Sequence, residues 1–116
     1  GKVVLLVDES TVSHAEYSAM GLQAATHTIT IGNTTAGQNG DISERFWLPG
    51  GVFSRFSGLG IRYFDGTPMQ RRGIKIDIRV RPTIKGLQDG RDEVLETAIK
   101  YLFQRPNAGN KISFSK

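Results

Sequence analysis

The side chains best suited to chemistry lie where a buried strand is followed by a helix. Residues 7–23 read VDESTVSHAEYSAMGLQ, and the join between the two elements holds Ser13, His14 and Glu16. Ser13 and Glu16 have the spacing of a capping box, in which the serine hydroxyl accepts from the backbone N–H three residues on and the glutamate reaches back to the N–H of the serine. Such a cap stabilises a helix by about 0.5–2 kcal/mol and requires no catalysis.

The same position also suits a nucleophile. A serine at the carboxyl end of a buried strand lies where α/β sheets usually bind ligands. The unpaired N–H groups of the first helical turn, that of His14 among them, can hold a developing oxyanion. A serine also needs a base, and neither histidine suits that task. His14 is adjacent to Ser13, and neighbouring residues on a helix do not face each other, while His27 opens the next strand at the other end of the sheet. The residues alone leave both roles of Ser13 open.

A strand, a helix and a second strand must position this join. Residues 2–8 (KVVLLVD) are a continuous apolar run, typical of a strand covered on both faces. Small apolar residues predict a helix from Ser13 to about Ala25, and residues 27–32 (HTITIG) predict the next strand. This order and spacing indicate a βαβ unit. A polar, glycine-rich loop over residues 33–41 follows it.

From Arg45 onward, the pattern changes to short strands joined by turns. Residues 45–57 predict a hairpin about Pro49-Gly50-Gly51, and residues 60–70 predict another about Asp65-Gly66.

The end of the chain predicts one more strand and one more helix. Residues 74–82 alternate apolar and charged side chains, as in a strand with one solvent-exposed face. Residues 90–106 have apolar side chains at helical spacing, acids at the start and a proline at the end, so they predict a helix. Residues 106–116 are expected to form a flexible tail. The expected fold class is therefore α/β (α+β): a mixed β-sheet with a βαβ unit, β-hairpins and a C-terminal helix.

Composition and charge disfavour several classes of function. The chain has 116 residues and no cysteine, so disulfides and thiolate metal ligands are absent. No apolar run approaches the ~20 residues of a membrane span, and no residues have the spacing of a metal site, so we expect no metal or cofactor. The net charge is +4, but the basic residues concentrate in the alternating stretch near residues 71–81. No nucleic-acid-binding motif accompanies them, so nucleic acid is not an expected partner.

Longer stretches of the chain resemble one protein family in their order and spacing. VVLLVDESTVSHAEYSAMGLQ is followed by TITIGNTTAGQNGD, LPGG, GIRYFDGTPMQRRGIKIDIRV and GRDEVLETAIKYL. This series resembles the C-terminal half of the catalytic domain of the C-terminal processing (tail-specific) serine proteases, especially the branch related to the tricorn core protease and the retinoid-binding repeats. The resemblance implies that residues 1–105 are the C-terminal part of a serine peptidase catalytic domain, cut from a longer protein.

The resemblance assigns roles to the residues of the join. The family's nucleophile is the serine three residues before a glutamate, which is Ser13 here, and its oxyanion hole uses the N–H of the next residue, His14. In the lysine-type members, a lysine in a GKG-like turn removes the proton of the serine. The matching turn here is AGQNG, with Gln38 at the place of the lysine. An amide does not accept a proton at any useful pH, so a Ser/Lys dyad is excluded at this position.

In the tricorn-like branch, the base comes from another part of the chain. It is a histidine from an upstream segment, supported by a further polar residue, and we expect that segment to precede Gly1 in the longer protein. Gln70 falls near the place of the supporting acid; it can orient a partner but carries no charge. Two further departures are Ile42, where the lysine-type enzymes have a glutamine, and Ile76, where the family has a proline.

The implied chemistry is acyl transfer by Ser13 through a covalent intermediate, with unfolded or C-terminal peptide segments as substrates. The loop 33–41 and the hairpin 45–57 are expected to border the cleft. Upstream domains of the same protein are implied as partners, and a periplasmic, cell-envelope or exported location is implied as well. Half a sheet leaves an open edge, so we also expect self-association.

Two alternatives remain open. The same fold serves as a non-catalytic domain that binds peptides or hydrophobic ligands, and Gln38 in place of a lysine favours this reading. The other alternative is a structural half-domain in which Ser13 only caps the helix.

Overall fold

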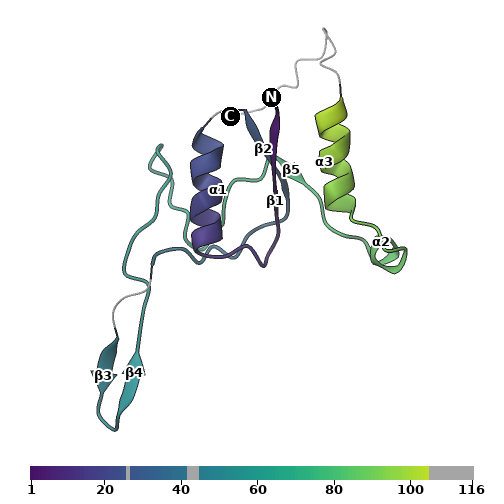
Figure 1. The fold of residues 1–116 in the computed structure, drawn as a ribbon. Coiled ribbons are helices and arrows are strands. Elements are labelled where there is room, and N and C mark those ends of the chain that lie inside the picture. Colours follow the sequence, from purple (N-terminus) through teal and green to yellow (C-terminus); the bar gives the residue numbers. More distant parts are fainter. Residues whose placement is uncertain (26, 42–44, 105–116) are drawn as a thin grey trace.

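Three parallel strands form the sheet that carries the join between strand and helix. The computed structural model describes residues 1–25, 27–41 and 45–104. β1 (Val3–Val7) pairs along its whole length with β2 (Thr28–Gly32), and β2 pairs with the short β5 (Ile78–Arg79), so the strand order is β1-β2-β5. Parallel neighbours need a crossover, and α1 (His14–Ala24) supplies it between β1 and β2 (Figure 1). This is the predicted βαβ unit, and its elements begin and end within one residue of the expected limits.

Two longer helices flank the sheet. α1 packs against β2, and α3 (Glu93–Phe103) packs against β1 and β2, so Figure 1 shows the strands between the two helices. α3 begins as its sequence predicts, because the side chain of Asp92 accepts a hydrogen bond from the N–H of Leu95 at 2.9 Å. The C-terminal helix of the sequence analysis is therefore confirmed.

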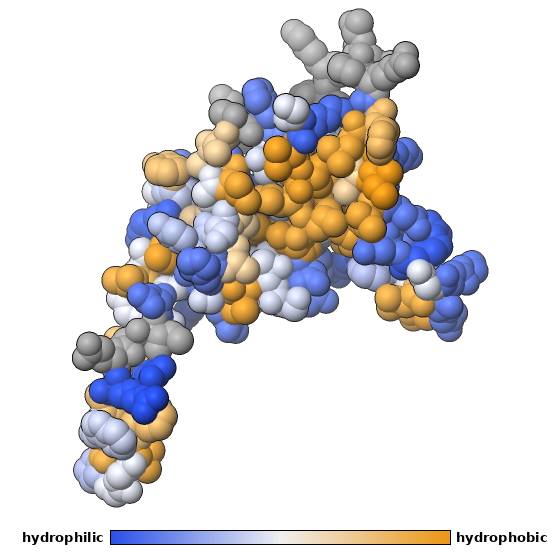
Figure 2. Space-filling model, viewed as in Figure 1, coloured by the Kyte–Doolittle hydropathy of each residue, from blue (hydrophilic) through white to orange (hydrophobic). Residues whose placement is uncertain are grey.

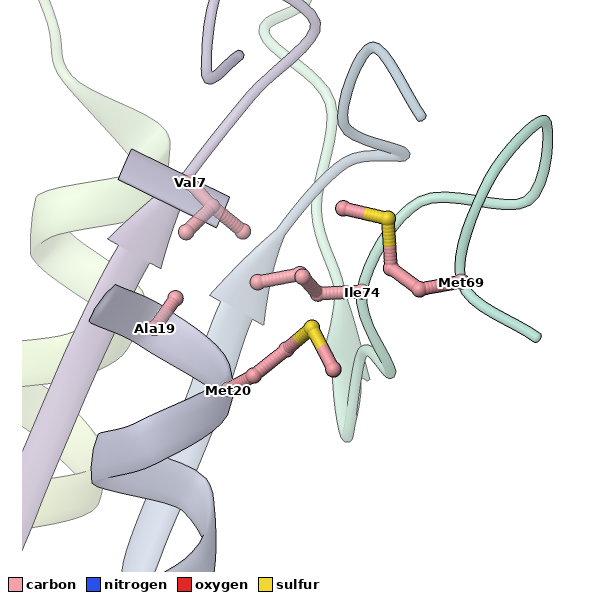
Figure 3. Packing of buried hydrophobic residues seen from close by; sticks show 5 residues of the cluster. All are labelled: Val7, Ala19, Met20, Met69 and Ile74. Carbon is pink, nitrogen blue, oxygen red and sulfur yellow. The ribbon is translucent and has the colours of Figure 1, made fainter. Parts of the chain in front are cut away.

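The buried core lies between α1, the sheet and the segment that leads to β5. Its buried members are Val7, Ala19, Met20, Met69 and Ile74 (Figure 3). The small side chain of Ala19 allows α1 to approach the sheet closely, and the unbranched methionines fill the irregular space beside it. This packing fixes α1 against the end of β1, and so fixes the join between them.

The predicted strand over residues 74–82 is much shorter than expected. Ile74 and Ile76 are buried or partly buried and Lys75 and Asp77 are exposed, so the alternation itself is confirmed. Side chains, however, interrupt the ladder with β2: the amide of Gln23 donates to the carbonyl of Lys75 at 2.7 Å, and the carboxylate of Asp77 accepts from the N–H of Thr30 at 2.8 Å. Regular pairing therefore begins only at β5.

The first predicted hairpin is present and extends away from the sheet. β3 (Phe46–Leu48) and β4 (Val52–Ser54) pair in antiparallel register about the predicted turn, where Gly50 and Gly51 have φ of 88° and 76°. Such positive φ values favour glycine. In Figure 1 the hairpin lies at the end of a long arm, far from the three-stranded sheet. The paired strands of the hairpin therefore lie away from the sheet, whereas Ser57 at the end of the predicted range lies next to Gly40 of the loop 33–41, where a Cβ on Gly40 would be 3.1 Å from the Ser57 Cβ.

The second predicted hairpin is a turn with little strand structure. Its two arms meet at one bridge, between Arg62 and Pro68, and the N–H of Tyr63 donates to the carbonyl of Thr67 at 2.9 Å. On the other side of the bridge, the N–H of Met69 donates to the carbonyl of Ile61 at 3.1 Å, and the N–H of Ile61 then donates to the side chain of Gln70 instead of continuing the ladder.

One helix was not predicted. α2 (Ile84–Gln88) is a short helix whose N-cap is Thr83, with the hydroxyl accepting from the N–H of Gly86 at 2.9 Å. It lies between the stretches predicted as a strand, residues 74–82, and as a helix, residues 90–106. The expected tail, residues 106–116, lies outside the described residues.

The apolar run of β1 predicted a strand covered on both faces. The described residues do not cover it in this way. Val3 and Leu6 are 45% and 44% exposed, because β1 is the end strand of the sheet. Figure 2 shows apolar side chains gathered over β1 and α3. The predicted α/β class is confirmed, with parallel strands in the sheet and antiparallel strands in the separate hairpin.

Candidate active site

Ser13 lies between the carboxyl end of β1 and the first residue of α1, in a strained backbone conformation. It is partly buried, and its φ and ψ are 55° and −116°. A non-glycine residue rarely adopts a positive φ, and such residues cost about 1–3 kcal/mol and cluster at functional sites. The surrounding structure must therefore hold Ser13 in place.

The predicted capping box is present in the structure. Oε2 of Glu16 accepts from the N–H of Ser13 at 3.1 Å, and the Ser13 side chain lies opposite the N–H of Glu16 in the reciprocal half of the box, without a regular cap hydrogen bond. An N-cap residue normally has extended φ and ψ, which direct its side chain to the first turn. The positive φ of Ser13 departs from that geometry, which weakens the Ser13 half of the box.

The turn before Ser13 is organised by Asp8. Its carboxylate accepts from the hydroxyl and the N–H of Ser10, at 2.5 and 2.9 Å, and these hydrogen bonds lower the pKa of Asp8. The N–H of Thr11 donates to the carbonyl of Asp8 at 3.1 Å. This tight turn at the carboxyl edge of the sheet leads the chain from β1 toward Ser13.

The loop 33–41 returns to the join and is bound there. The N–H of Ala36 donates to the carbonyl of Thr11 at 3.0 Å, and the N–H of Gln38 donates to Oε2 of Glu16, also at 3.0 Å. Gln38, at the place of the family's lysine, therefore has its backbone close to Ser13, and its side chain is exposed.

The amide of Gln70 is bound to a neighbouring segment. Its nitrogen donates to the carbonyl of Leu59 at 2.5 Å, and its oxygen accepts from the N–H of Ile61 at 3.2 Å. A Cβ on Gly40 would lie 2.7 Å from the Gln70 nitrogen, so Gln70 is next to the loop 33–41. In this arrangement, Gln70 joins two backbone segments.

Neither histidine forms a hydrogen bond with Ser13 in the part of the chain that the structure describes. The ring of His14 is beside that of Tyr17 on α1, with centroids 6.4 Å apart. The backbone N–H of His14 belongs to the first turn of α1, and the N–H groups of a first helical turn have no acceptors inside the helix. His27 comes before β2 and lines a cavity with Lys2 and Tyr101, at the opposite end of the sheet from Ser13. Ile42 lies outside the described residues.

A second cavity, of about 470 Å³, opens at the carboxyl edge of the sheet. Asp8, Thr11 and Asn33 line it on one side, and Val80 and Leu87 are among the residues that line the other. It is therefore next to the turn that leads to Ser13.

Across the described ranges, no group of three or more His, Asp or Glu side chains could hold a metal ion, and no helix is long and apolar enough to cross a membrane.

Sequence reasoning missed the residues that bind the loop 33–41 to the helix. These are Thr35 and Gly37, which both donate hydrogen bonds to Glu16. The capping-box pattern identified Glu16, but nothing local in the sequence connects it with residues 19 and 21 positions away.

A model of one protein family matches most of this chain. It is described as Peptidase family S41, and it matches residues 1–80. The chain belongs to peptidase family S41. The resemblance found in the sequence is therefore confirmed at the family level.

Solved structures share the fold of the S41 chain. A Parabacteroides merdae protein proposed to be a peptidase is 23% identical, with a TM-score of 0.83 over 95% of this chain and 34% of that one. Mature CPAF complexed with lactacystin is 20% identical, with a TM-score of 0.77 over 87% of this chain and 20% of that one. The S41 chain thus spans about a third and a fifth of these two chains. No curated protein matches it significantly.

Proposed function

We propose that this chain carries the nucleophile of a serine-type endopeptidase, and that Ser13 attacks the substrate carbonyl to form an acyl-enzyme. The observation that carries the proposal is the strained backbone of Ser13 at the carboxyl edge of the sheet, where its hydroxyl makes no regular cap hydrogen bond. Strain at one residue persists only where the surroundings impose it, and it is common where a side chain must be presented for reaction.

The oxyanion of this reaction would be held by the N–H of His14. That group belongs to the first turn of α1, where unpaired N–H groups and the helix dipole favour negative charge. Substrates of the extended, unfolded or C-terminal peptide class follow from the family resemblance, as does an exported or cell-envelope location.

The base must come from outside this chain. Gln38 and Gln70 carry amides, which are not bases. His14 is the neighbour of Ser13 on the helix, where adjacent residues do not face each other, and His27 lines the cavity at the other end of the sheet. A histidine from an upstream part of the protein is the proposed base. We therefore expect the 116-residue chain alone to be inactive on peptides.

A fluorophosphonate probe tests the nucleophile in the full-length protein. The probe should label Ser13 in the wild type and in Ser18→Ala, which removes an exposed serine of the same helix. It should not label Ser13→Ala. Absence of label in a folded wild-type protein would reject the proposed nucleophile.

The second candidate is a non-catalytic domain that binds peptides or hydrophobic ligands. The uncharged Gln38 at the place of the family's lysine favours it, as does the Gln70 amide, which is bound to the backbone near residues 59–61. Peptide binding without probe labelling would support this function instead.

A further inference from the structure

Glu16 is a fully buried carboxylate that the proposed acyl transfer does not use. Its exposed fraction is 0%, and within the described residues no lysine or arginine forms an ion pair with it. Burial of a charge is costly unless the charge is paired or fully hydrogen-bonded. Glu16 meets the second condition, because four donors surround it.

The four donors come from two segments that meet at the join. Oε1 accepts from the hydroxyl of Thr35 at 2.5 Å and from the N–H of Gly37 at 2.7 Å. Oε2 accepts from the N–H of Ser13 at 3.1 Å and from the N–H of Gln38 at 3.0 Å. One oxygen thus bonds Ser13 and the loop residue Gln38 at the same time.

Thr35 extends this network to a third segment. Its hydroxyl donates to Glu16 and accepts from the N–H of Ile74 at 3.0 Å, on the way to β5. The backbones approach closely here: a Cβ on Gly73 would lie 2.6 Å from the Thr35 hydroxyl. Glu16 and Thr35 therefore join α1, the loop 33–41 and the segment before β5.

The N–H of Ser13 is engaged by this network. Because Glu16 accepts from it, this N–H is not available to an oxyanion. The N–H of His14, one residue on, remains for that task. The network thus decides which backbone donor at the join is free.

We propose that Glu16 is a positioning residue, which holds Ser13 in its strained conformation by bonding the Ser13 N–H to the loop 35–38. The inference rests on the proposed function of Ser13, and Thr35 is the residue that orients the Glu16 carboxylate. The role requires a carboxylate, because each oxygen accepts two hydrogen bonds. A glutamine would turn its NH₂ group toward two donors.

The test combines probe reactivity with amide hydrogen exchange in the full-length protein. Thr35→Val removes the hydroxyl, and Thr34→Val is the matched control, since Thr34 is an exposed neighbour whose hydroxyl accepts only from Arg79 among the described residues. Thr35→Val and Glu16→Gln should each slow fluorophosphonate labelling of Ser13 by roughly tenfold or more, because they break hydrogen bonds to a charged group. Thr34→Val and Thr35→Ser should label as the wild type does.

Exchange reports the network without any chemistry at Ser13. The amides of Ser13, Gly37 and Gln38 should be protected in the wild type and in Thr35→Ser. In Thr35→Val they should exchange roughly tenfold faster or more, while amides of β2 keep their rates. Wild-type labelling and exchange rates in both Thr35→Val and Glu16→Gln would overturn the inference and leave the proposed function intact. A folded wild type that refuses the probe rejects the proposed function, and unprotected amides at these three positions reject the positioning network.

Discussion

At the scale of single residues, the backbone of Ser13 has a feature that a capping residue does not need. Its φ is positive, although Ser13 and Glu16 form the predicted capping box. The N–H of Ser13 donates to Glu16 at 3.1 Å. A residue that served stability alone would adopt the extended conformation of an ordinary N-cap.

Replacement of Ser13 by glycine should therefore stabilise the protein. Ser13→Gly relieves the strain of the positive φ and should raise the free energy of unfolding by about 1 kcal/mol, whereas Ser13→Ala keeps the strain and should change it little. Both variants should lose fluorophosphonate labelling. Urea unfolding of the two variants measures the difference, and a Ser13→Gly protein less stable than Ser13→Ala would contradict the strained conformation.

Asp8 should make stability depend on acid pH. Hydrogen bonds from Ser10 lower the pKa of Asp8 below its ordinary 3.8, so the folded state holds this carboxylate ionised more readily than the unfolded state. The resulting stabilisation is present above that ordinary pKa and is lost as the pH falls through the lower folded value.

The comparison of wild type with Asp8→Asn isolates this contribution. Between pH 5 and about 2, the urea midpoint of the wild type should fall more steeply than that of Asp8→Asn. Ser10→Ala removes one of the donors and should give an intermediate slope. Parallel curves for all three proteins would show that the turn does not depend on the ionised carboxylate.

At the scale of elements, the end of β2 leaves no room for a side chain. Gly32 has φ of 139°, and a Cβ there would lie 1.8 Å from the carbonyl oxygen of Val7 on β1. β1 and β2 can pair through Val7 and Gly32 only because this position is glycine. The pairing brings the carboxyl ends of both strands together beside the join.

Two glycine substitutions should consequently have opposite effects. Gly32→Ala should destabilise the protein by about 3 kcal/mol or more, because the backbone of β1 must move. Gly21→Ala, on an exposed position of α1 with nothing within 4 Å, should stabilise it by about 0.5–1 kcal/mol through helix propensity. Thermal unfolding of both variants measures this, and equal shifts would contradict the close contact at Gly32.

At the scale of the whole molecule, the described residues leave a large apolar surface open. It spans β1 and α3 (Figure 2), and its exposed members include Val3, Leu6, Leu95, Ile99 and Leu102. Surfaces of this kind usually bind another protein surface, and β1 adds the unpaired edge of an end strand. A chain that spans about a third of one related structure and a fifth of another fits this picture.

The 116-residue chain should therefore self-associate. Light scattering over a wide concentration range should show a mass above that of the monomer. Ile99→Glu, which places a charge on the apolar surface, should shift the distribution toward monomer, whereas Leu22→Glu on the other long helix, where exposure is similar, should not. A monodisperse monomer at all concentrations would contradict the prediction.

The sequence by itself determined the elements whose signals are local. The apolar run of β1, the small residues of α1 and the apolar spacing of α3 depend on neighbours a few positions away, and these three elements are confirmed. The spacing of Ser13 and Glu16 also predicted the capping box, in which the N–H of Ser13 donates to Glu16.

The tertiary structure decided what these residues do together. The length of β5 depends on Gln23 and Asp77, whose side chains bond the backbone of segments far away in the chain. The strained φ of Ser13 and the four hydrogen bonds of Glu16 likewise depend on where the loop 33–41 returns. Sequence patterns report propensities within one element, whereas these contacts join segments that meet only when the core has packed α1 against the sheet.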